Sequence, residues 1–291
     1  MKYRALFFGL TTIDIQYFVE EFPEANKKIK SDAPEIMVGG PAANAAVAFS
    51  FLNNGTYFIS SIGKGPFSSL IREDFITTNL KFTDFSSDDT APTIASVVTS
   101  ANGDRNIFTH HPEAVIPGID ASELLDKVNP EIILLDGFYP EFGISLARQA
   151  SNKNIPVVLD CGSWKPQYSD LLKYTHTVIC SKDFLPPACG NTDDVFFFLR
   201  KAGVKNIAMS RGHKSILYRS NGKRGEVQVK SCKVVDTLGA GDFLHGAFCY
   251  YFLQHKNFKQ ALIAASKLAS FTCTLKGTRN WLKHRNMMHF M

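Results

Sequence analysis

Short runs of apolar residues alternate with longer, mixed stretches along most of the chain. The runs cover residues 3–8, 57–62, 132–135, 157–159, 178–179 and 207–209. A strand that is buried on both of its faces reads as a nearly continuous apolar run, so these segments predict a mostly parallel sheet with helices on both faces. The pattern therefore indicates an α/β fold.

The stretches between these runs carry the signals of helix ends. Pro41 follows two glycines and predicts the first turn of a helix, because the N–H that proline lacks is not needed there. That helix is expected to end at residues 53–55, which read Asn-Asn-Gly. Residues 68–79 and 258–275 predict two further helices, and Gly277 is expected to end the second of them.

Two polar segments, at about residues 10–36 and 90–112, interrupt this alternation. The second contains the segments 94–99 and 106–110 on either side of an Asn-Gly pair, which is the signal of a β-hairpin. Another Asn-Gly pair predicts a second hairpin within residues 216–229. The two polar segments are therefore expected to lie outside the pattern of the central sheet.

Composition and charge exclude several classes of protein. No repeat or linker divides the 291 residues, so we expect residues 1–291 to form a single domain. The net charge is +5, but Lys and Arg are scattered, so no nucleic-acid partner is expected. No apolar run is long enough to span a bilayer, so no membrane partner is expected. The six cysteines include no Cys-x-x-Cys pair, and the expected compartment is the cytoplasm.

The strongest chemical signal is a glycine-rich string that precedes an apolar pattern with helical spacing. It consists of Asp236, Thr237, Leu238, Gly239, Ala240, Gly241 and Asp242. Small residues at a helix start leave backbone N–H groups free to bind an anion. A carboxylate just beyond them would repel that anion and is better placed to take a proton from an attacking hydroxyl. A capped turn, in which the helix dipole alone favours Asp242, is equally compatible with these residues.

This string resembles the C-terminal signature of the PfkB, or ribokinase-like, carbohydrate kinases. The resemblance implies that Asp242 is the catalytic base and that residues 239–241 form an anion hole for the transferred phosphoryl group. It also implies that Asp236 and Thr237 contribute to a monovalent-cation site, for which K⁺ is the candidate ion. ATP and Mg²⁺ are the cofactors that the family implies.

A second signal lies near the start of the chain. Asp14 is expected in the loop after the first strand, and Asn44 in the first turn of the helix that begins at Pro41. Taken alone, these residues are more typical of a turn and of a helix start. However, the string 39–44 resembles the N-terminal glycine-glycine signature of the same family. That resemblance implies that Asp14, Gly40 and Asn44 bind the sugar hydroxyls.

Two further candidates lie on predicted turns. Ser210, Arg211 and Gly212 resemble the family's Thr-x-Gly turn, in which a hydroxyl and a glycine contact the nucleotide and Arg211 would add charge. An ordinary turn at the end of a strand fits these residues equally well. Arg105, beside the first Asn-Gly pair, is a candidate substrate-binding residue, although an arginine on a hairpin is more often a surface residue.

The chain departs from the family pattern after residues 57–62, where an acidic residue and a second glycine are usual and this chain reads Gly63-Lys64-Gly65-Pro66-Phe67-Ser68, and in a second motif. The family's Asn-x-x-Glu motif, which helps to place magnesium-bound water, is absent. Its expected place reads Cys180-Ser181-Lys182-Asp183-Phe184, which is similar to ketohexokinase-like members. Pro41 and Asp104 stand where that group presents asparagines to the sugar, so the sequence does not select fructose.

The resemblance covers about residues 3–280 and implies a ribokinase-like fold, in which the two polar segments form a small β lid over the sugar. We therefore expect an ATP-dependent kinase that phosphorylates a hydroxyl of a small sugar or sugar-like alcohol. The alternatives are a nucleoside or a sugar phosphate as acceptor, and a non-catalytic regulator that binds sugar or nucleotide. An exposed edge of the lid sheet is expected to pair two copies into a homodimer.

Overall fold

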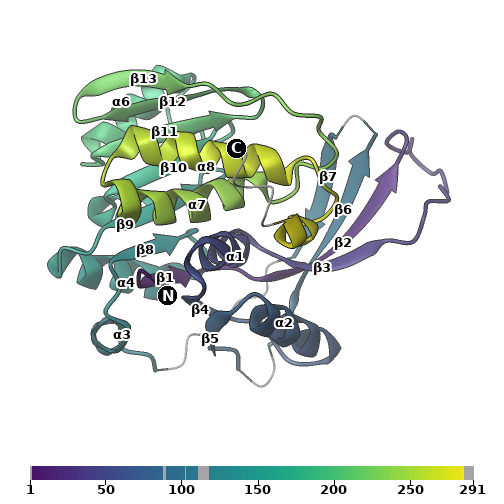
Figure 1. The fold of residues 1–291 in the computed structure, drawn as a ribbon, viewed down its shortest axis with the longest axis horizontal. Coiled ribbons are helices and arrows are strands. Elements are labelled where there is room, and N and C mark those ends of the chain that lie inside the picture. The colour runs from purple at the N-terminus through teal and green to yellow at the C-terminus, as the bar shows by residue number, and fades with distance from the viewer. Residues whose placement is uncertain (1, 88–89, 102, 111–117, 285–291) are drawn as a thin grey trace.

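The computed structural model describes residues 2–87, 90–101, 103–110 and 118–284, and a nine-stranded sheet runs through its centre (Figure 1). Its strands lie in the order β13 (Lys223–Val227), β12 (Lys214–Ser220), β11 (Asn206–Arg211), β10 (Thr177–Ser181), β9 (Val157–Cys161), β8 (Ile132–Leu135), β1 (Ala5–Phe8), β4 (Thr56–Ser60) and β5 (Leu80–Asp84). Neighbours from β11 to β5 run parallel, and β12 and β13 add an antiparallel hairpin at one edge. The prediction of a mostly parallel sheet is confirmed.

Helices cover both faces of this sheet because its strands are apolar on both sides. In β1, Ala5 and Phe7 belong to one buried cluster, whereas Leu6 and Phe8 belong to another on the opposite face. The first cluster includes residues of α1 (Pro41–Asn53), α2 (Pro66–Thr77), α7 (Ala240–His255) and α8 (Phe258–Thr272). The second includes residues of α3 (Ala121–Val128), α4 (Pro140–Asn152), α5 (Tyr168–Leu171), the 3₁₀ helix η1 (Leu172–Tyr174) and α6 (Thr192–Lys201).

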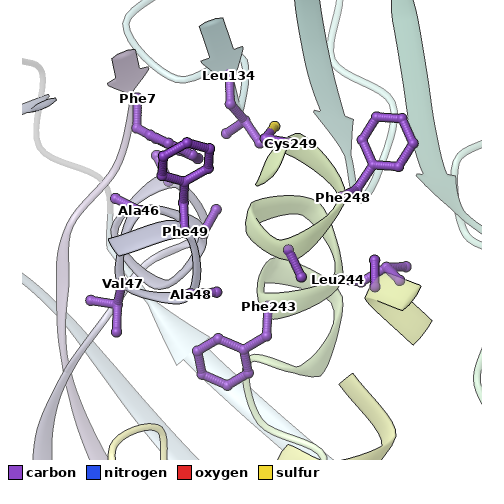
Figure 2. Packing of buried hydrophobic residues seen from close by; sticks show 14 of the residues in the cluster. Phe7, Ala46, Val47, Ala48, Phe49, Leu134, Phe243, Leu244, Phe248 and Cys249 are labelled. Carbon is purple, nitrogen blue, oxygen red and sulfur yellow. The ribbon is translucent and has the colours of Figure 1, made fainter. Parts of the chain in front are cut away.

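Helices α1 and α7 pack closely against each other beneath Phe7 of β1 and Leu134 of β8, as Figure 2 shows. Much of the α1 sequence is alanine, whose small side chain lets a neighbouring helix approach the α1 backbone closely. Gly246 in the middle of α7 lies against the α1 backbone, and a Cβ atom built there would lie only 2.0 Å from the carbonyl oxygen of Ala45. This close approach brings the N-terminal turns of the two helices together.

The two polar segments form a separate four-stranded sheet, the lid, beside the central sheet (Figure 1). Its strands lie in the order β3 (Glu35–Gly39), β2 (Thr12–Val19), β6 (Thr93–Ser100) and β7 (Arg105–Thr109). The predicted hairpin is confirmed as the antiparallel pair of β6 and β7. Residue 102 and positions 111–112 of the second polar segment lie outside the described residues.

The expectation that Asp14 lies in a loop was wrong, because Asp14 lies within β2. In this strand Thr12, Asp14 and Gln16 alternate with apolar residues, and all three polar side chains are buried. The alternation is the period of a strand, but its polar face turns inward instead of toward solvent. A segment that reads as polar is therefore a strand with a buried polar face.

The end of one helix and the presence of one strand also differ from the prediction. The last long helix, α8, ends at Thr272, and Gly277 lies in the turns that follow it. Strand β5 was not predicted, because its apolar and polar residues alternate at the sheet edge.

Within the described residues, none of the helices combines the length and apolar character that crossing a membrane requires.

Candidate active site

A cavity of about 470 Å³ lies between the lid, the end of the central sheet and the N-terminal turn of α7. Parallel strands of an open α/β sheet end at one edge, and ligands bind in the crevice there. Most of the predicted site residues line this cavity, namely Asp14, Gly40, Asn44, Arg105, Ser210, Gly239, Gly241 and Asp242. Residues from both ends of the sequence therefore meet in one place.

Helix α7 begins at the glycine-rich string. Gly239 is its N-cap residue and has a positive φ of 74°, a conformation that favours glycine. A side chain there would also crowd the Phe243 ring and the amide of Asn44, since a Cβ atom would lie 3.0 and 3.2 Å from them. Glycine at the N-cap has no side chain that could cap the first N–H groups of the helix, although the N–H of Ala240 donates to the carbonyl oxygen of Thr237 at 3.2 Å. A helix start of this kind can bind an anion.

Asp242 lies in this first turn, and its Oδ2 atom accepts a hydrogen bond of 2.9 Å from Nδ2 of Asn44. Burial raises the pKa of Asp242 to about 7, with a further rise from the nearby Asp160 carboxylate. The bond from Asn44 and the electrostatic effects of His245 and Arg105 lower the pKa of Asp242. A carboxyl with a pKa near neutral pH suits a general base.

Asp14 faces the cavity from the inner side of the lid. It is 5% exposed, and one carboxylate oxygen accepts a hydrogen bond of 2.6 Å from the Thr12 hydroxyl. Burial raises its pKa to about 6, while the Thr12 bond and the charge of Arg279 lower it. At neutral pH this carboxylate is mainly ionised and can accept hydrogen bonds from hydroxyl groups.

Arg105, on β7 of the lid, reaches the loop before α7. Its guanidinium donates a hydrogen bond to the hydroxyl of Thr237, and the arginine lines the cavity. The Thr237 hydroxyl in turn donates a hydrogen bond of 3.4 Å to the carbonyl oxygen of Gly103, which lies two residues before β7. The structure therefore brings Arg105 to the site, although the residue is exposed.

Asp236 and Thr237 are engaged in hydrogen bonds within the protein. The buried Asp236 carboxylate accepts bonds from the backbone N–H groups of Leu238 and Gly277, both at 2.9 Å, and from the Gln16 amide at 3.0 Å. Asp236 thus joins the lid, the loop before α7 and the C-terminal segment. Its part in a cation site stays a prediction.

The three residues of the predicted nucleotide turn lie in different surroundings. Ser210 lines the cavity, and Gly212 is exposed at the tip of the turn. Arg211, by contrast, donates to both the carbonyl and the hydroxyl of Ser215, at 2.9 and 2.8 Å. Its guanidinium therefore stabilises the β11–β12 hairpin in this structure, and a contact with phosphate stays a prediction.

Two site residues were missed by sequence reasoning. His245 lies one turn after Asp242 on α7, and its ring nitrogens lie 2.6 and 2.9 Å from the carbonyl oxygens of Gly241 and Ile179. Asp160 lies at the end of β9, lines the cavity and has its Oδ1 atom 3.4 Å from the His245 ring. Two signals in the sequence could have indicated them. Asp160 directly follows the apolar run 157–159, and His245 lies three residues after Asp242, on the same side of a helix.

An enzyme that moves a phosphoryl group to an alcohol needs a base for the hydroxyl proton beside a site for an anion. The first turn of α7 provides both in one lidded cavity, so the site has the composition of a small-molecule kinase. The family model of the pfkB family carbohydrate kinases matches residues 3–285, and the chain belongs to this family. It is thus a phosphotransferase with an alcohol group as acceptor.

Individual relatives agree with this assignment. A ribokinase from Arabidopsis thaliana is 26% identical over 288 residues, which cover 92% of this chain and 76% of the relative. A nucleoside kinase from Methanocaldococcus jannaschii is 24% identical over 284 residues, which cover 92% and 90%. The structure of Arabidopsis thaliana ribokinase complexed with ribose and ATP matches 100% of this chain and 98% of that chain, with a TM-score of 0.79 at 21% identity. The ribokinase-like fold is confirmed.

Proposed function

We propose that the protein transfers the γ-phosphoryl group of ATP to a hydroxyl of a small, uncharged sugar or sugar-like alcohol. The observation that carries this proposal is the pairing of Asp242 with Asn44 at the start of α7, in the same cavity as Asp14. Among the described residues that line the cavity, Arg105 is the one Lys or Arg, whereas Asp14, Asp160, Asp183 and Asp242 are acidic. This excess of carboxylates favours an uncharged acceptor over a sugar phosphate.

In this proposal the acceptor lies under the lid, with Asp14 and the backbone at Gly40 holding its hydroxyl groups. Asp242 takes the proton of the accepting hydroxyl as its oxygen attacks the phosphorus in line. The N–H groups at the start of α7 stabilise the charge on the phosphoryl oxygens, and Arg105 adds positive charge from the lid. The lid limits access of water, which reduces wasteful hydrolysis of ATP.

The residues around Asp160 suit Mg²⁺. Asp160 lines the cavity, and among the described residues its Oδ2 atom has no hydrogen-bond partner. Carboxylate oxygens are ligands that Mg²⁺ and its bound waters prefer. Asp160 and Asp183, which both line the cavity, would hold the hydrated ion. The ion would supply positive charge that offsets the charge of the phosphates. A K⁺ ion near Asp236 belongs to the same proposal, but no step depends on it.

We place this reaction in the cytoplasm as part of the proposal. The six cysteines all lie within the described residues and are free thiols. A reducing compartment keeps thiols in this state, and the cytoplasm also supplies ATP.

The test of the proposed function is ADP release with ATP and Mg²⁺ across neutral sugars, nucleosides and sugar phosphates. We expect turnover with a neutral sugar and little with its phosphate ester, because of the carboxylates in the cavity. Turnover restricted to nucleosides would favour the alternative acceptor, for which the apolar walls at Phe138 and Ile107 offer a surface for a base. Turnover restricted to sugar phosphates would contradict the charge argument. ATP binding without turnover on any acceptor would favour a regulator.

We also propose that two copies of the chain pair through the outer face of the lid. The register of the lid strands places four exposed side chains on this face: Phe108 at 67% exposure, Ile36 at 50%, Ile94 at 38% and Tyr17 at 37%. All residues of the edge strand β7 are also exposed. A contiguous apolar face beside an open edge is typical of a contact surface, and a second copy of the same face fits it by two-fold symmetry.

Substitution of Phe108 by glutamate is expected to raise the dissociation constant of the dimer at least about thirtyfold, since it places a charge in the apolar contact. Sedimentation velocity over a range of concentrations measures this constant. Ile76→Glu is the matched control, because Ile76 is 79% exposed on α2 and is not part of the lid. A monomeric wild type, or a dimer unaffected by Phe108→Glu, would contradict the proposal.

A further inference from the structure

Arg279 lies beyond α8, outside every motif described above, yet it contacts the active site. Its guanidinium pairs with the carboxylate of Asp74 on α2, with Nε 2.9 Å from Oδ1 and Nη2 3.1 Å from Oδ2. The side chains of the pair are 17% and 15% exposed. Two parallel bonds fix the plane of a guanidinium, so the third nitrogen has a defined direction.

That third nitrogen, Nη1, donates a hydrogen bond of 2.8 Å to Oδ1 of Asn44. A carboxamide carries its oxygen and its NH₂ group on opposite sides. When Oδ1 accepts from Arg279, Nδ2 must point the other way, and there it lies 2.9 Å from Oδ2 of Asp242. The reversed amide would place its oxygen against the carboxylate of Asp242 and its NH₂ group against the guanidinium, and both contacts are repulsive.

We propose that Arg279 is a positioning residue for phosphoryl transfer, which locks the Asn44 amide in the orientation that donates a hydrogen bond to Asp242. This inference rests on the proposed role of Asp242 as the base. A purely structural role, which ties α2 to the C-terminal segment, needs only the bonds to Asp74 and the bond of 3.1 Å from Nη1 to the carbonyl oxygen of Thr278. The shorter bond to Asn44, a residue that contacts the base, is the feature that such a role leaves unexplained.

The charges around Asp242 come from several elements. Asp160 on β9 opposes ionisation of Asp242, while His245 on α7 and Arg105 on β7 favour it. The bond from Asn44 also favours the ionised form. An amide that is free to rotate loses this bond for part of the time, and the pKa of Asp242 then rises.

The test is the pH profile of kcat/KM for Arg279→Met beside the wild type, with the acceptor found in the panel above. We expect the acid limb of the profile to move up by about 0.5 to 1 pH unit, with an activity loss of roughly three- to eightfold at pH 6.5 that largely recovers at pH 8.5. In an Asn44→Ala background, the same substitution should have little further effect, because the arginine acts through Asn44. An unchanged acid limb, or independent effects of the two substitutions, would overturn the inference.

Two variants control for folding. Asp74→Asn combined with Arg279→Met removes both charges, so it leaves no unpaired buried carboxylate, and it should show the same shifted limb. Arg72→Met breaks another ion pair of α2, with Asp84 at 2.6 Å, and should leave the limb in place. Failure of the proposed function itself is distinguished by the wild type, which would then show no turnover, or by Asp242→Asn, which would then stay active.

Discussion

Replacement of Asp242 by asparagine is expected to lower kcat by about a thousandfold, within the range that a general base contributes. Asparagine has nearly the same shape and can still accept the hydrogen bond that Asn44 donates at 2.9 Å. It cannot take the proton of the attacking hydroxyl. The first turn of α7 keeps its N–H groups, so the dissociation constant for ATP, measured by calorimetry, should stay within a few-fold of the wild-type value.

The same role predicts the pH dependence of the wild type. Burial raises the pKa of Asp242 to about 7, so the carboxyl is protonated below that pH and has no free site for another proton. The value of kcat/KM, which reports ionisations of the free enzyme, should therefore fall about tenfold per unit as the pH decreases below 7, and the residual activity of Asp242→Asn should lack this limb. Turnover that survives in the variant would remove Asp242 from the mechanism.

Replacement of Gly246 by alanine is expected to lower the free energy of unfolding by about 3 kcal/mol, at the upper end of the cost of overpacking a core. In an ordinary helix this change stabilises, because glycine is a poor helix former. Here the new methyl group would lie 2.0 Å from the carbonyl oxygen of Ala45, and a backbone atom cannot move aside as a side chain can. Helices α1 and α7 must therefore separate. Differential scanning calorimetry should show a decrease in Tm of roughly 6–12 °C.

Gly190→Ala is the matched control for this substitution. A Cβ atom at Gly190 would meet its nearest neighbour, Oδ2 of Asp194, at 3.8 Å, which is an ordinary contact. We expect the unfolding free energy of this variant to change by no more than about 0.5 kcal/mol. A Gly246→Ala protein that is as stable as the wild type would contradict the tight packing of the two helices.

The sequence was most informative where burial or backbone geometry leaves few choices. Strands buried on both faces must be apolar throughout, so runs such as residues 132–135 were recognised directly. Pro41 and Gly239 mark the starts of α1 and α7 because each position has a special backbone requirement. The two glycine-rich strings, by contrast, indicated a site only through their resemblance to the family's signatures, because their residues alone fit a capped turn or a helix start at least as well.

Long-range pairing could not be predicted in the same way. Asp14 was expected in a loop, because nothing local indicates that β2 pairs with β6 about eighty residues away. Arg279 likewise reaches Asn44 across most of the chain, and Arg105 reaches Thr237 from the lid. A charged side chain carries no periodic signal that names its partner, so these contacts follow only from the assembled fold.

The three hydrogen bonds of Asp236 affect the order in which parts of the chain can fold during synthesis. This carboxylate holds Gln16 of the lid strand β2 and the backbone of Gly277 at the same time. During translation the N-terminal lid strand therefore leaves the ribosome long before the segment that secures it. Until residues 236 and 277 have emerged, Gln16 lacks the bond to Asp236 that ties the lid to the C-terminal part of the chain, and contacts of such high sequence separation form late. The cavity that we propose as the substrate site is thus expected to be completed only at the end of synthesis.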